Sequence, residues 1–416
     1  MTEHYDSLET RSPDEREAQL MAALPKQIAH AKRRAPGLKR ILKGIDAKHV
    51  DSRAALAKLP VTRKSDLGEL QRALPPLGGL NATPIEKLNK LFISPGPIYE
   101  PEGGGTDWWR TARGLYAGGF RAGDLVVNTF AYHFTPAGSM LESGARAVGC
   151  TVVPTGTGQT EMQVSTIRDL GAVAFVGTPS FLKLIVEKSA ELTVDIACLK
   201  RAHVGAEYLP PALREAMRAR GIHVSQTYAT ADLGLLAYES LNPDGSVNEG
   251  MVLDEQLIVE IVRPGTGDPV SAGEVGEVVV TTFNKDYPLV RFGTGDLSAV
   301  LPGVSPCGRT NTRIKGWMGR ADQTTKVRAI FVTPKQVNEV LRRHPEVAKG
   351  RLVVEGETGN DRMTLKCEAS ARPAGLVEAI VASIRDVTKL RGEVELVVPG
   401  SLPNDGKVIE DLRKYG

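Results

Sequence analysis

The stretch YPLVRFGTGDLS (Tyr287–Ser298), together with GRADQTTKV (Gly319–Val327) further along the chain, gives the strongest indication of the fold. In the first stretch a predicted strand ends in a Gly-Thr-Gly turn that carries one carboxylate, Asp296. In the second, Arg320 and Asp322 lie in another glycine-led turn. Glycine lets the backbone come close to a ligand, and a short acidic side chain at such a turn accepts hydrogen bonds from vicinal hydroxyls. The two turns therefore predict a binding site for a hydroxyl-bearing ligand.

Upstream of these turns, short apolar runs typical of β-strands alternate with segments of helix length such as SMLESGARAV (Ser139–Val148). Strands separated by helices predict a βαβ series and a parallel sheet, with ligand-binding loops at the carboxyl ends of the strands. The expected strands are DLVVNTF (Asp124–Phe130), CTVVPT (Cys150–Thr155), AVAFVGT (Ala172–Thr178), RAHVGA (Arg201–Ala206) and HVSQTYA (His223–Ala229). Residues 10–70 are expected to form helices interrupted by prolines.

From about Gln256 the pattern changes to hairpin-like runs, QLIVEIV and GEVVVTTF, which predict an antiparallel β appendage. After Asp322 the chain restarts with TPKQVNEVLRRH (Thr333–His344), a typical Thr-Pro helix start, and continues in a βαββαβ-like order. We therefore expect an α/β protein with two domains. The large N-terminal domain, residues 1–320, would carry the mostly parallel sheet and its appendage, and residues 321–416 would form a small α+β domain.

Composition excludes several classes of protein. The 416 residues are 41% hydrophobic and 24% charged, and 52 basic against 49 acidic residues leave a net charge of +3. This balance predicts a soluble globular chain with no nucleic-acid or membrane partner. The four cysteines, Cys150, Cys198, Cys307 and Cys367, are widely spaced, which argues against a structural zinc site or a disulfide framework. Because no apolar leader or spanning segment is present, we expect a cytoplasmic location.

Several segments together resemble phenylacetate-CoA ligases, members of the adenylate-forming (AMP-binding, acyl-CoA synthetase) superfamily. LPVTRKSDL (Leu59–Leu67) is similar to the LP-x-T-x-K-x-D-L segment of these ligases. PTGTGQTEMQ (Pro154–Gln163) and GTPSFL (Gly177–Leu182) match further segments at similar spacing. The resemblance covers nearly the whole chain. It implies an AMP-forming ligase that uses ATP, Mg²⁺ and CoA to activate a small, phenylacetate-like carboxylic acid, with a possible homodimer as its assembly.

The resemblance also assigns roles to residues of the large domain. VSQTYATADLG (Val224–Gly234) is similar to the family's Tyr-Gly-x-Thr/Ser-Glu motif, so Tyr228 takes the adenine-stacking role and Asp232 the Mg²⁺ role. VGAEYLP (Val204–Pro210) resembles the segment along the adenine and acyl pocket. The implied set of ATP- and AMP-binding residues is Gly205, Ala206, Glu207, Tyr228, Asp232, Asp296 and Arg320, the last two holding the ribose.

Two further regions are implied by the same resemblance. AYHFTPAG (Ala131–Gly138) borders the aryl and CoA sites of the family, which makes Tyr132, His133 and Phe134 candidates for the acyl pocket. A packed loop with a hydrogen-bonded histidine is the alternative reading. LPNDGKVIEDLR (Leu402–Arg413) resembles the family's C-terminal Gly-Lys loop, so Lys407 would reach the active site during adenylation. The small domain would then be a mobile lid that turns about a hinge near Asp322.

The sequence departs from the family at the phosphate loop, where ISPGPIYEPEGGG (Ile93–Gly105) replaces a Ser/Thr/Gly-rich loop followed by lysine. Three prolines each remove a backbone donor, and Glu100 and Glu102 add negative charge where phosphates would bind. Ser94 and Gly96 remain as candidate phosphate-loop residues. Ala329 stands where the family has a glycine near the CoA tunnel.

These departures leave two other hypotheses open. An adenylating enzyme with a non-CoA acceptor is motivated by Ala329. A non-catalytic nucleotide-binding homologue is motivated by the proline- and glutamate-rich loop, although Asp296, Arg320, Asp322 and Lys407 are all present.

Overall fold

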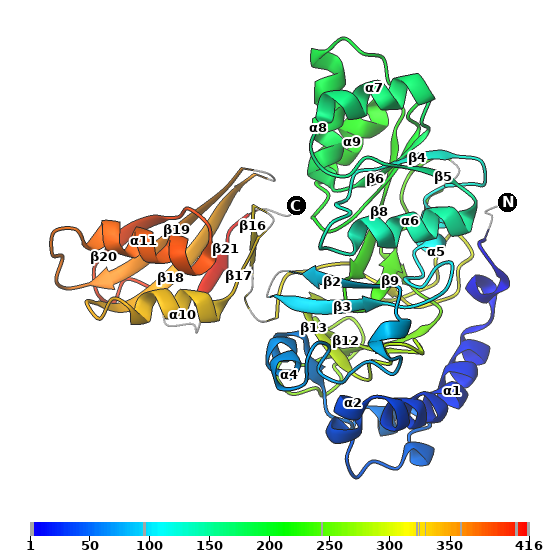
Figure 1. Ribbon diagram of the computed structural model, residues 1–416, viewed down its shortest axis with the longest axis horizontal. Helices are drawn as coiled ribbons and strands as arrows, with labels where there is room; N and C mark the ends of the chain where they lie inside the picture. The colour runs from blue at the N-terminus through cyan, green and yellow to red at the C-terminus, as the bar shows by residue number, and fades with distance from the viewer. Residues whose placement is uncertain are drawn as a thin grey trace. The chain divides into compact units, whose positions relative to one another are not determined.

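The structure, a computed structural model, describes residues 4–94, 97–242, 244–321, 323, 325–328, 330–357, 360–403 and 407–413. The chain divides into two compact units, residues 1–319 and 320–416, drawn in Figure 1 from blue to yellow and from yellow to red. Each unit contains hydrophobic core clusters of its own.

A nine-stranded sheet forms the centre of the larger unit, in the order β14-β15-β10-β9-β8-β7-β6-β4-β5. The five strands from β8 to β5 pair in parallel, and the remaining pairs are antiparallel. The predicted parallel βαβ sheet is therefore confirmed. The strands are β4 (Leu125–Asn128), β5 (Thr151–Pro154), β6 (Ala174–Gly177), β7 (Arg201–Val204), β8 (His223–Thr230), β9 (Gly234–Tyr238), β10 (Met251–Leu253), β14 (Val300–Leu301) and β15 (Arg313–Ile314).

Helices cover both faces of the parallel strands (Figure 1). Buried residues of α7, α8 and α9 pack on one set of strand side chains, and those of α5 and α6 pack on the alternate set. Because successive side chains of a strand point to opposite faces, this arrangement makes a three-layer α/β/α sandwich. The helices are α5 (Ala112–Ala117), α6 (Ala137–Val148), α7 (Thr160–Leu170), α8 (Pro179–Glu191) and α9 (Pro211–Ala219).

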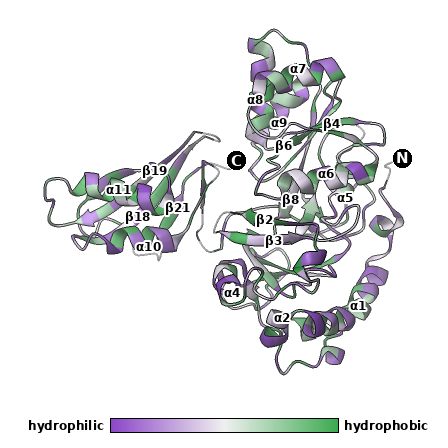
Figure 2. Ribbon diagram, in the orientation of Figure 1, coloured by the Kyte–Doolittle hydropathy of each residue, from purple (hydrophilic) through white to green (hydrophobic). Residues whose placement is uncertain are grey.

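A second sheet, in the order β1-β13-β12-β11, packs with the N-terminal helices. Strands β11 (Leu257–Val262) and β12 (Gly276–Thr282) form the predicted antiparallel hairpin, and β1 (Thr62–Arg63) pairs in parallel with β13 (Phe292–Ser298). The helices are α1 (Pro13–Arg34), α2 (Pro36–Ile41), α3 (Arg53–Leu56) and α4 (Leu67–Ala73), with 3₁₀ turns η1 (Ser7–Thr10), η2 (Ala47–His49), η3 (Lys64–Asp66) and η4 (Ile85–Lys87). Figure 2 shows α1 coloured largely as hydrophilic along its visible face.

The backbone around Asp296 differs from the predicted turn. Strand β13 continues through the Gly-Thr-Gly sequence, and Asp296 lies inside the strand. Between the pairs Glu277↔Leu297 and Val279↔Gly293 the register shifts, so residues 294–296 of β13 oppose one residue of β12. Gly295 takes a φ of 74°, which glycine adopts without a steric penalty. The extra residues form a β-bulge, a device that changes the direction of a strand's side chains.

The phosphate-loop segment also contains more regular structure than expected. Residues Lys90–Ser94 and Ile98–Glu102 form an antiparallel hairpin, β2 and β3, with Phe92 opposite Glu100. Helix α4 supports it through Gln71, which exchanges two hydrogen bonds with the backbone of Tyr99. In an isolated pair of strands, each strand has one edge that faces no other strand. Proline, which has no N–H to donate, is tolerated there. Of the segment predicted as a loop, residues 93–94 and 98–102 are therefore strand.

The smaller unit is an α+β fold around a sheet of order β20-β19-β18-β21, packed with two helices. The predicted helix start is confirmed, since Thr333 and Gln336 form a capping box with Pro334 in the first turn of α10. One strand, β21, lies in the Lys407 segment where no strand was expected. The elements are β16 (Thr325–Val327), β17 (Ile330–Val332), α10 (Pro334–Arg342), β18 (Val347–Glu357), β19 (Asn360–Ala369), α11 (Leu376–Thr388), β20 (Glu393–Val397) and β21 (Ile409–Asp411).

Candidate functional site

The predicted nucleotide residues follow two neighbouring parallel strands at the edge where both strands end. Gly205, Ala206 and Glu207 come directly after β7, and Tyr228 lies near the end of β8. The two segments are joined because the Gln226 side chain donates to the Glu207 carbonyl at 3.0 Å. Ligands of open α/β sheets bind outside the carboxyl ends of the strands, so this edge is the candidate site.

The backbone after β7 is shaped to leave space at this edge. A side chain in place of the hydrogen of Gly205 would approach the Thr227 side chain to 2.9 Å, so only glycine fits there without a shift. Ala206 has a φ of 65° and is exposed. A non-glycine residue in the left-handed region is uncommon and often marks a functional turn.

Asp296 is held by two aromatic side chains from different segments. The Tyr228 hydroxyl donates to Asp296 Oδ2 at 2.8 Å, and Trp317 Nε1 donates to Oδ1 at 3.1 Å. The Thr294 hydroxyl donates to the Val278 carbonyl and accepts from the Asp296 amide at 3.1 Å, which supports the bulge. Both carboxylate oxygens are thus oriented by fixed donors. Tyr228 and Asp296, predicted separately, lie in direct contact.

Asp232 forms an ion pair with a lysine from a distant segment. Lys64, in the turn η3 after β1, places its ammonium on Asp232 Oδ2. The Asp232 side chain is fully buried, whereas that of Lys64 is 24% exposed. The second oxygen, Oδ1, is buried and has no hydrogen-bond partner among the described residues. A buried carboxylate oxygen without a partner is costly unless another group uses it, which is what a bound cation would do.

The Mg²⁺ role of Asp232 can be compared with this geometry. Within the described parts of the chain, no group of three or more His, Cys, Asp or Glu side chains is arranged to hold a metal ion. Mg²⁺ that accompanies a nucleotide is commonly bound by only one or two carboxylates plus phosphate oxygens. The single open oxygen of Asp232 fits that mode of binding, in which the nucleotide supplies most of the ligands.

Glu100, on the hairpin strand β3, lies beside the Lys64–Asp232 pair. Its side chain is fully buried, its Oε1 is hydrogen-bonded to the Ser94 hydroxyl, and its Oε2 has no partner among the described residues. Burial, and then the negative charge of Asp232, raise the pKa of the Glu100 carboxyl from 4.5 to about 8, against the lowering effect of Lys64. The Glu100 carboxyl therefore stays largely protonated at pH 7, so it adds less negative charge than its sequence position implied.

A Glu100→Gln variant tests this protonation. Wild-type stability is expected to fall as pH rises from about 4.5 to about 8, because the folded protein keeps a proton that the unfolded chain has released. Glutamine resembles the protonated acid and cannot ionise, so the variant should melt roughly 2–5 °C above the wild type at pH 9, and the gap should close towards pH 5. Thermal unfolding at both pH values measures this difference.

Glu86→Gln, a change at an exposed glutamate upstream of the same hairpin, controls for the loss of one formal charge. A melting difference between Glu100→Gln and the wild type that stays constant from pH 5 to pH 9 would show that Glu100 is already ionised at the lower pH.

The three predicted acyl-pocket residues follow β4 but differ in their surroundings. The Tyr132 hydroxyl accepts from Asn128 Nδ2 at 2.8 Å, and burial together with Glu142 raises the pKa of Tyr132. His133 is exposed, and Phe134 is 70% exposed with a φ of 62°. The described residues do not enclose His133 and Phe134, so the acyl-pocket role of this trio stays a prediction.

The remaining predicted site residues either belong to the smaller unit or lie outside the residues that the structure describes. Arg320 begins the smaller unit, and Lys407 precedes its strand β21. The Lys407 ammonium is 3.9 Å from Glu410, and the side chain is 52% exposed. Asp322 and Gly96 fall outside the described residues. The pairing of Arg320 and Lys407 with residues of the larger unit therefore stays a prediction.

Sequence analysis missed two residues of the site, Lys64 and Trp317. Lys64 is the sixth residue of the LPVTRKSDL segment, and a lysine within a segment that resembles the family was the signal that could have found it. Trp317 comes two residues before Gly319, but nothing in its local sequence marks it as a partner of Asp296. Both contacts join segments far apart in the chain, which a linear pattern does not reveal.

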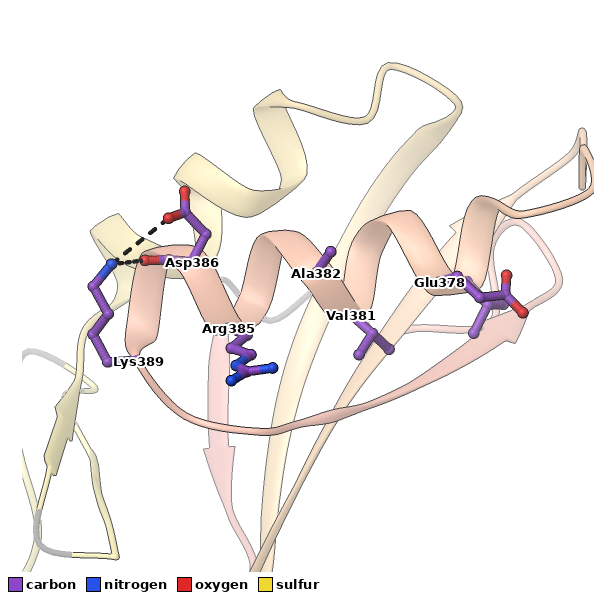
Figure 3. A pocket seen from close by; sticks show the side chains of 7 residues that line it. Glu378, Val381, Ala382, Arg385, Asp386 and Lys389 are labelled. Atoms are coloured by element: carbon purple, nitrogen blue, oxygen red, sulfur yellow. Dashed lines mark hydrogen bonds and ion pairs between the residues drawn. The ribbon is translucent and has the colours of Figure 1, made fainter.

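Two hollows of the surface are lined by other residues. One lies against the N-terminal segment of the larger unit and is lined by charged side chains that include Asp107, Arg110 and Arg113. The other lies along the outer face of α11 (Figure 3), where Lys389 contacts Asp386. Neither contains a predicted site residue.

Comparisons with known proteins identify relatives of this chain. Residues 107–284 match the family of AMP-binding enzymes. The chain is 32% identical to the phenylacetate-coenzyme A ligase of Aromatoleum evansii, over 87% of this chain and 84% of that protein. It is 30% identical to the ligase of the same name from Thermus thermophilus, over 99% of this chain and 100% of that protein. It is 29% identical to the phenylacetate-coenzyme A ligase of Escherichia coli K12, over 98% of this chain and 97% of that protein.

Solved structures support the fold. A 2-hydroxyisobutyryl-CoA ligase in complex with its acyl-adenylate and CoA, in the thioester-forming state, superposes with a TM-score of 0.82. It covers 98% of this chain and 92% of its own, at 24% identity. An open conformation of that ligase superposes with a TM-score of 0.71. In the described parts of the chain, no helix has the length and apolar character needed to cross a bilayer.

Proposed function

Because the chain belongs to the family of phenylacetate-coenzyme A ligases among the AMP-binding enzymes, we propose that it joins a small, phenylacetate-like carboxylic acid to CoA at the expense of ATP. The observation that carries this proposal is the end-to-end match with the Thermus ligase. The contact between Tyr228 and Asp296 supports it, because the two side chains expected to hold the nucleoside meet at one edge of the sheet.

In the first half-reaction a carboxylate oxygen of the acid attacks the α-phosphorus of ATP. The bond from the α-phosphorus to the bridging oxygen breaks, and pyrophosphate leaves with that electron pair. Two anions must meet in this step, so cationic side chains that face the developing charge accelerate it. Lys407 is the cation proposed at the α-phosphate, and Arg320 is proposed to share the ribose with Asp296.

Lys64 is proposed to contribute the positive charge that the phosphate-loop segment lacks. Its ammonium lies on Asp232, next to the hairpin that carries Ser94 and the neutral Glu100. The cluster therefore has no net negative charge to repel a triphosphate. Mg²⁺ bound with the nucleotide would be held by Asp232 Oδ1 and would neutralise phosphate charge there.

In the second half-reaction the CoA sulfur attacks the acyl carbonyl, AMP leaves, and the thiol proton is released. We propose that the smaller unit is a lid that turns about Asp322 between the two steps, as hinge motions of a few backbone angles allow. The division into units at residues 319 and 320 supports a pivot close to that residue. The raised pKa of Glu100 weakens the argument for a non-catalytic homologue, because a protonated carboxyl carries no charge against the phosphates.

Two finer proposals accompany this function. A cytoplasmic location is supported by the four cysteines, none of which forms a disulfide bond within the described residues. A homodimer is implied by the family resemblance alone, and light scattering would test it.

An ATP–pyrophosphate exchange screen over carboxylic acids tests the proposed function. We expect exchange that requires an acid, with arylacetic acids among the best substrates, and a CoA thioester detected by mass spectrometry when CoA is added. A chain that is silent against a broad panel of acids would refute the ligase assignment. Exchange without a CoA product would instead select the non-CoA acceptor.

A further inference from the structure

The strand that follows Lys407 is held at its start by a side chain from the beginning of the smaller unit. Gln323 Oε1 accepts two backbone hydrogen bonds, from the Val408 amide at 2.7 Å and from the Ile409 amide at 3.2 Å. An amide oxygen has two lone pairs, so one glutamine satisfies both donors. Lys407 immediately precedes these two residues, and its backbone direction is set by them.

The same two residues are fixed from their other side by the sheet. The Leu352 amide donates to the Val408 carbonyl at 2.9 Å, and β21 pairs in parallel with β18 from Ile409 onwards. Strand β18 is central in its sheet, whereas β21 is a three-residue edge strand. The two bonds from Gln323 act at the start of this short strand, whereas Thr325 and Arg351 contact its later residues, Asp411 and Glu410.

The segment before Lys407 is anchored as well, by groups of the sheet. Lys349 and Arg351 donate to the Pro403 carbonyl at 2.9 and 3.0 Å, and the Leu402 amide donates to Glu368 at 2.7 Å. These contacts hold the peptide some residues away from Lys407. Gln323, by contrast, binds the backbone amides of Val408 and Ile409, which directly follow Lys407.

Gln323 also occupies an unusual backbone position. Its φ is 57°, in the left-handed region, and it directly follows Asp322, the predicted hinge. Non-glycine residues in this region persist where the surrounding structure holds them. Gln323, next to the predicted pivot Asp322, thus accepts hydrogen bonds from the backbone that directly follows Lys407, the predicted catalytic cation.

We propose that Gln323 is a positioning residue that fixes the backbone of Lys407 for adenylate formation. The proposal rests on the function proposed above. In this arrangement the chain segment that leaves the pivot carries the lysine strand with it, so the cation keeps one position relative to the turning point. A displacement of about 1 Å at a reacting group can reduce a rate by up to about a hundredfold, so even a small loosening would be measurable.

The test compares Gln323→Ala and Gln323→Glu in the full-length protein. Alanine removes the acceptor but keeps a side chain at the left-handed position, so the backbone preference changes little. We expect Gln323→Ala to lower the kcat of pyrophosphate release about ten- to a hundredfold, with KM for ATP within about threefold. Thioester formation from a supplied acyl-adenylate should stay within about twofold of the wild type. Glutamate retains the accepting oxygens and should restore most of the adenylation rate.

Gln336→Ala is the matched control, because Gln336 also makes side-chain to backbone hydrogen bonds in the smaller unit but caps α10. It should leave the ratio of the two half-reactions unchanged. Amide hydrogen exchange gives a readout that needs no activity, since Val408 and Ile409 should exchange faster in Gln323→Ala and not in Gln336→Ala.

Equal losses in both half-reactions, or an unchanged adenylation rate in an active protein, would overturn the positioning role alone. A wild-type protein that releases no pyrophosphate with any acid would overturn the proposed function and this role with it.

Discussion

A Lys407→Ala variant is expected to form acyl-adenylate about a hundred- to a thousandfold more slowly than the wild type. The loss should match that of other groups that stabilise charge developing in a transition state. The Lys407 side chain is half exposed and forms a long ion pair with Glu410. An exposed pair of this kind adds little to stability, so the variant should fold normally. Acid-dependent pyrophosphate release measures the rate.

Thioester formation from a supplied acyl-adenylate should be nearly unchanged in the same variant, because Lys407 is proposed to act only before pyrophosphate leaves. Lys389→Ala is the matched control: Lys389 is an exposed lysine of the same unit and lies at the end of α11 (Figure 3). It should retain both half-reactions. If Lys407→Ala formed adenylate at the wild-type rate, the catalytic role of this lysine would be wrong.

A Lys64→Met variant is expected to lose about a hundredfold in kcat/KM for ATP and about 3 kcal/mol in the free energy of unfolding. The activity loss follows from removing the cation beside the phosphate segment. The stability loss follows because the Asp232 carboxylate stays buried without its partner. Breaking one side of a buried ion pair costs more than the pair contributes, since the remaining charge keeps its desolvation penalty. Steady-state kinetics at varied ATP and denaturant unfolding measure the two effects.

The double variant Lys64→Met/Asp232→Asn separates these effects. Removing both charges should return most of the lost stability, because no unpaired charge remains buried, while the activity should stay low. Lys90→Met is the control. Lys90 is the first residue of the β2–β3 hairpin that carries Glu100, and its ammonium is 3.8 Å from the Glu102 carboxylate. Full ATP affinity in a folded Lys64→Met protein would remove Lys64 from the phosphate site.

The layered fold could be predicted because its signals are local and repeated. The runs that became β4, β6 and β7 are short and apolar, and they are buried between helices on both faces. Such strands need no partner-specific signal, since burial on two faces alone selects apolar residues. The Thr-Pro start of α10 was predictable for a similar reason, because a capping box is contained within four residues.

The β2–β3 hairpin and the protonated Glu100 could not be predicted in this way. A segment with three prolines and two glutamates is typical of a loop, and a glutamate is expected to be charged. Gln71 of α4 holds the Tyr99 backbone of the hairpin, and the pKa of Glu100 is raised by burial and then by Asp232. Both causes come from residues far away in the sequence.

The amino-acid sequence by itself determined the class of fold, the family resemblance and the separate segments that carry Tyr228, Asp232, Asp296 and Lys407. Those properties depend on periodicity and short motifs, which are linear. The tertiary structure alone decided which side chains meet: Tyr228 and Trp317 on Asp296, Lys64 on Asp232, and Gln323 on the peptides after Lys407. Hydrogen bonds and charge interactions act over a few ångströms, so their partners are set by packing, and a protonation state such as that of Glu100 follows only once the packing exists.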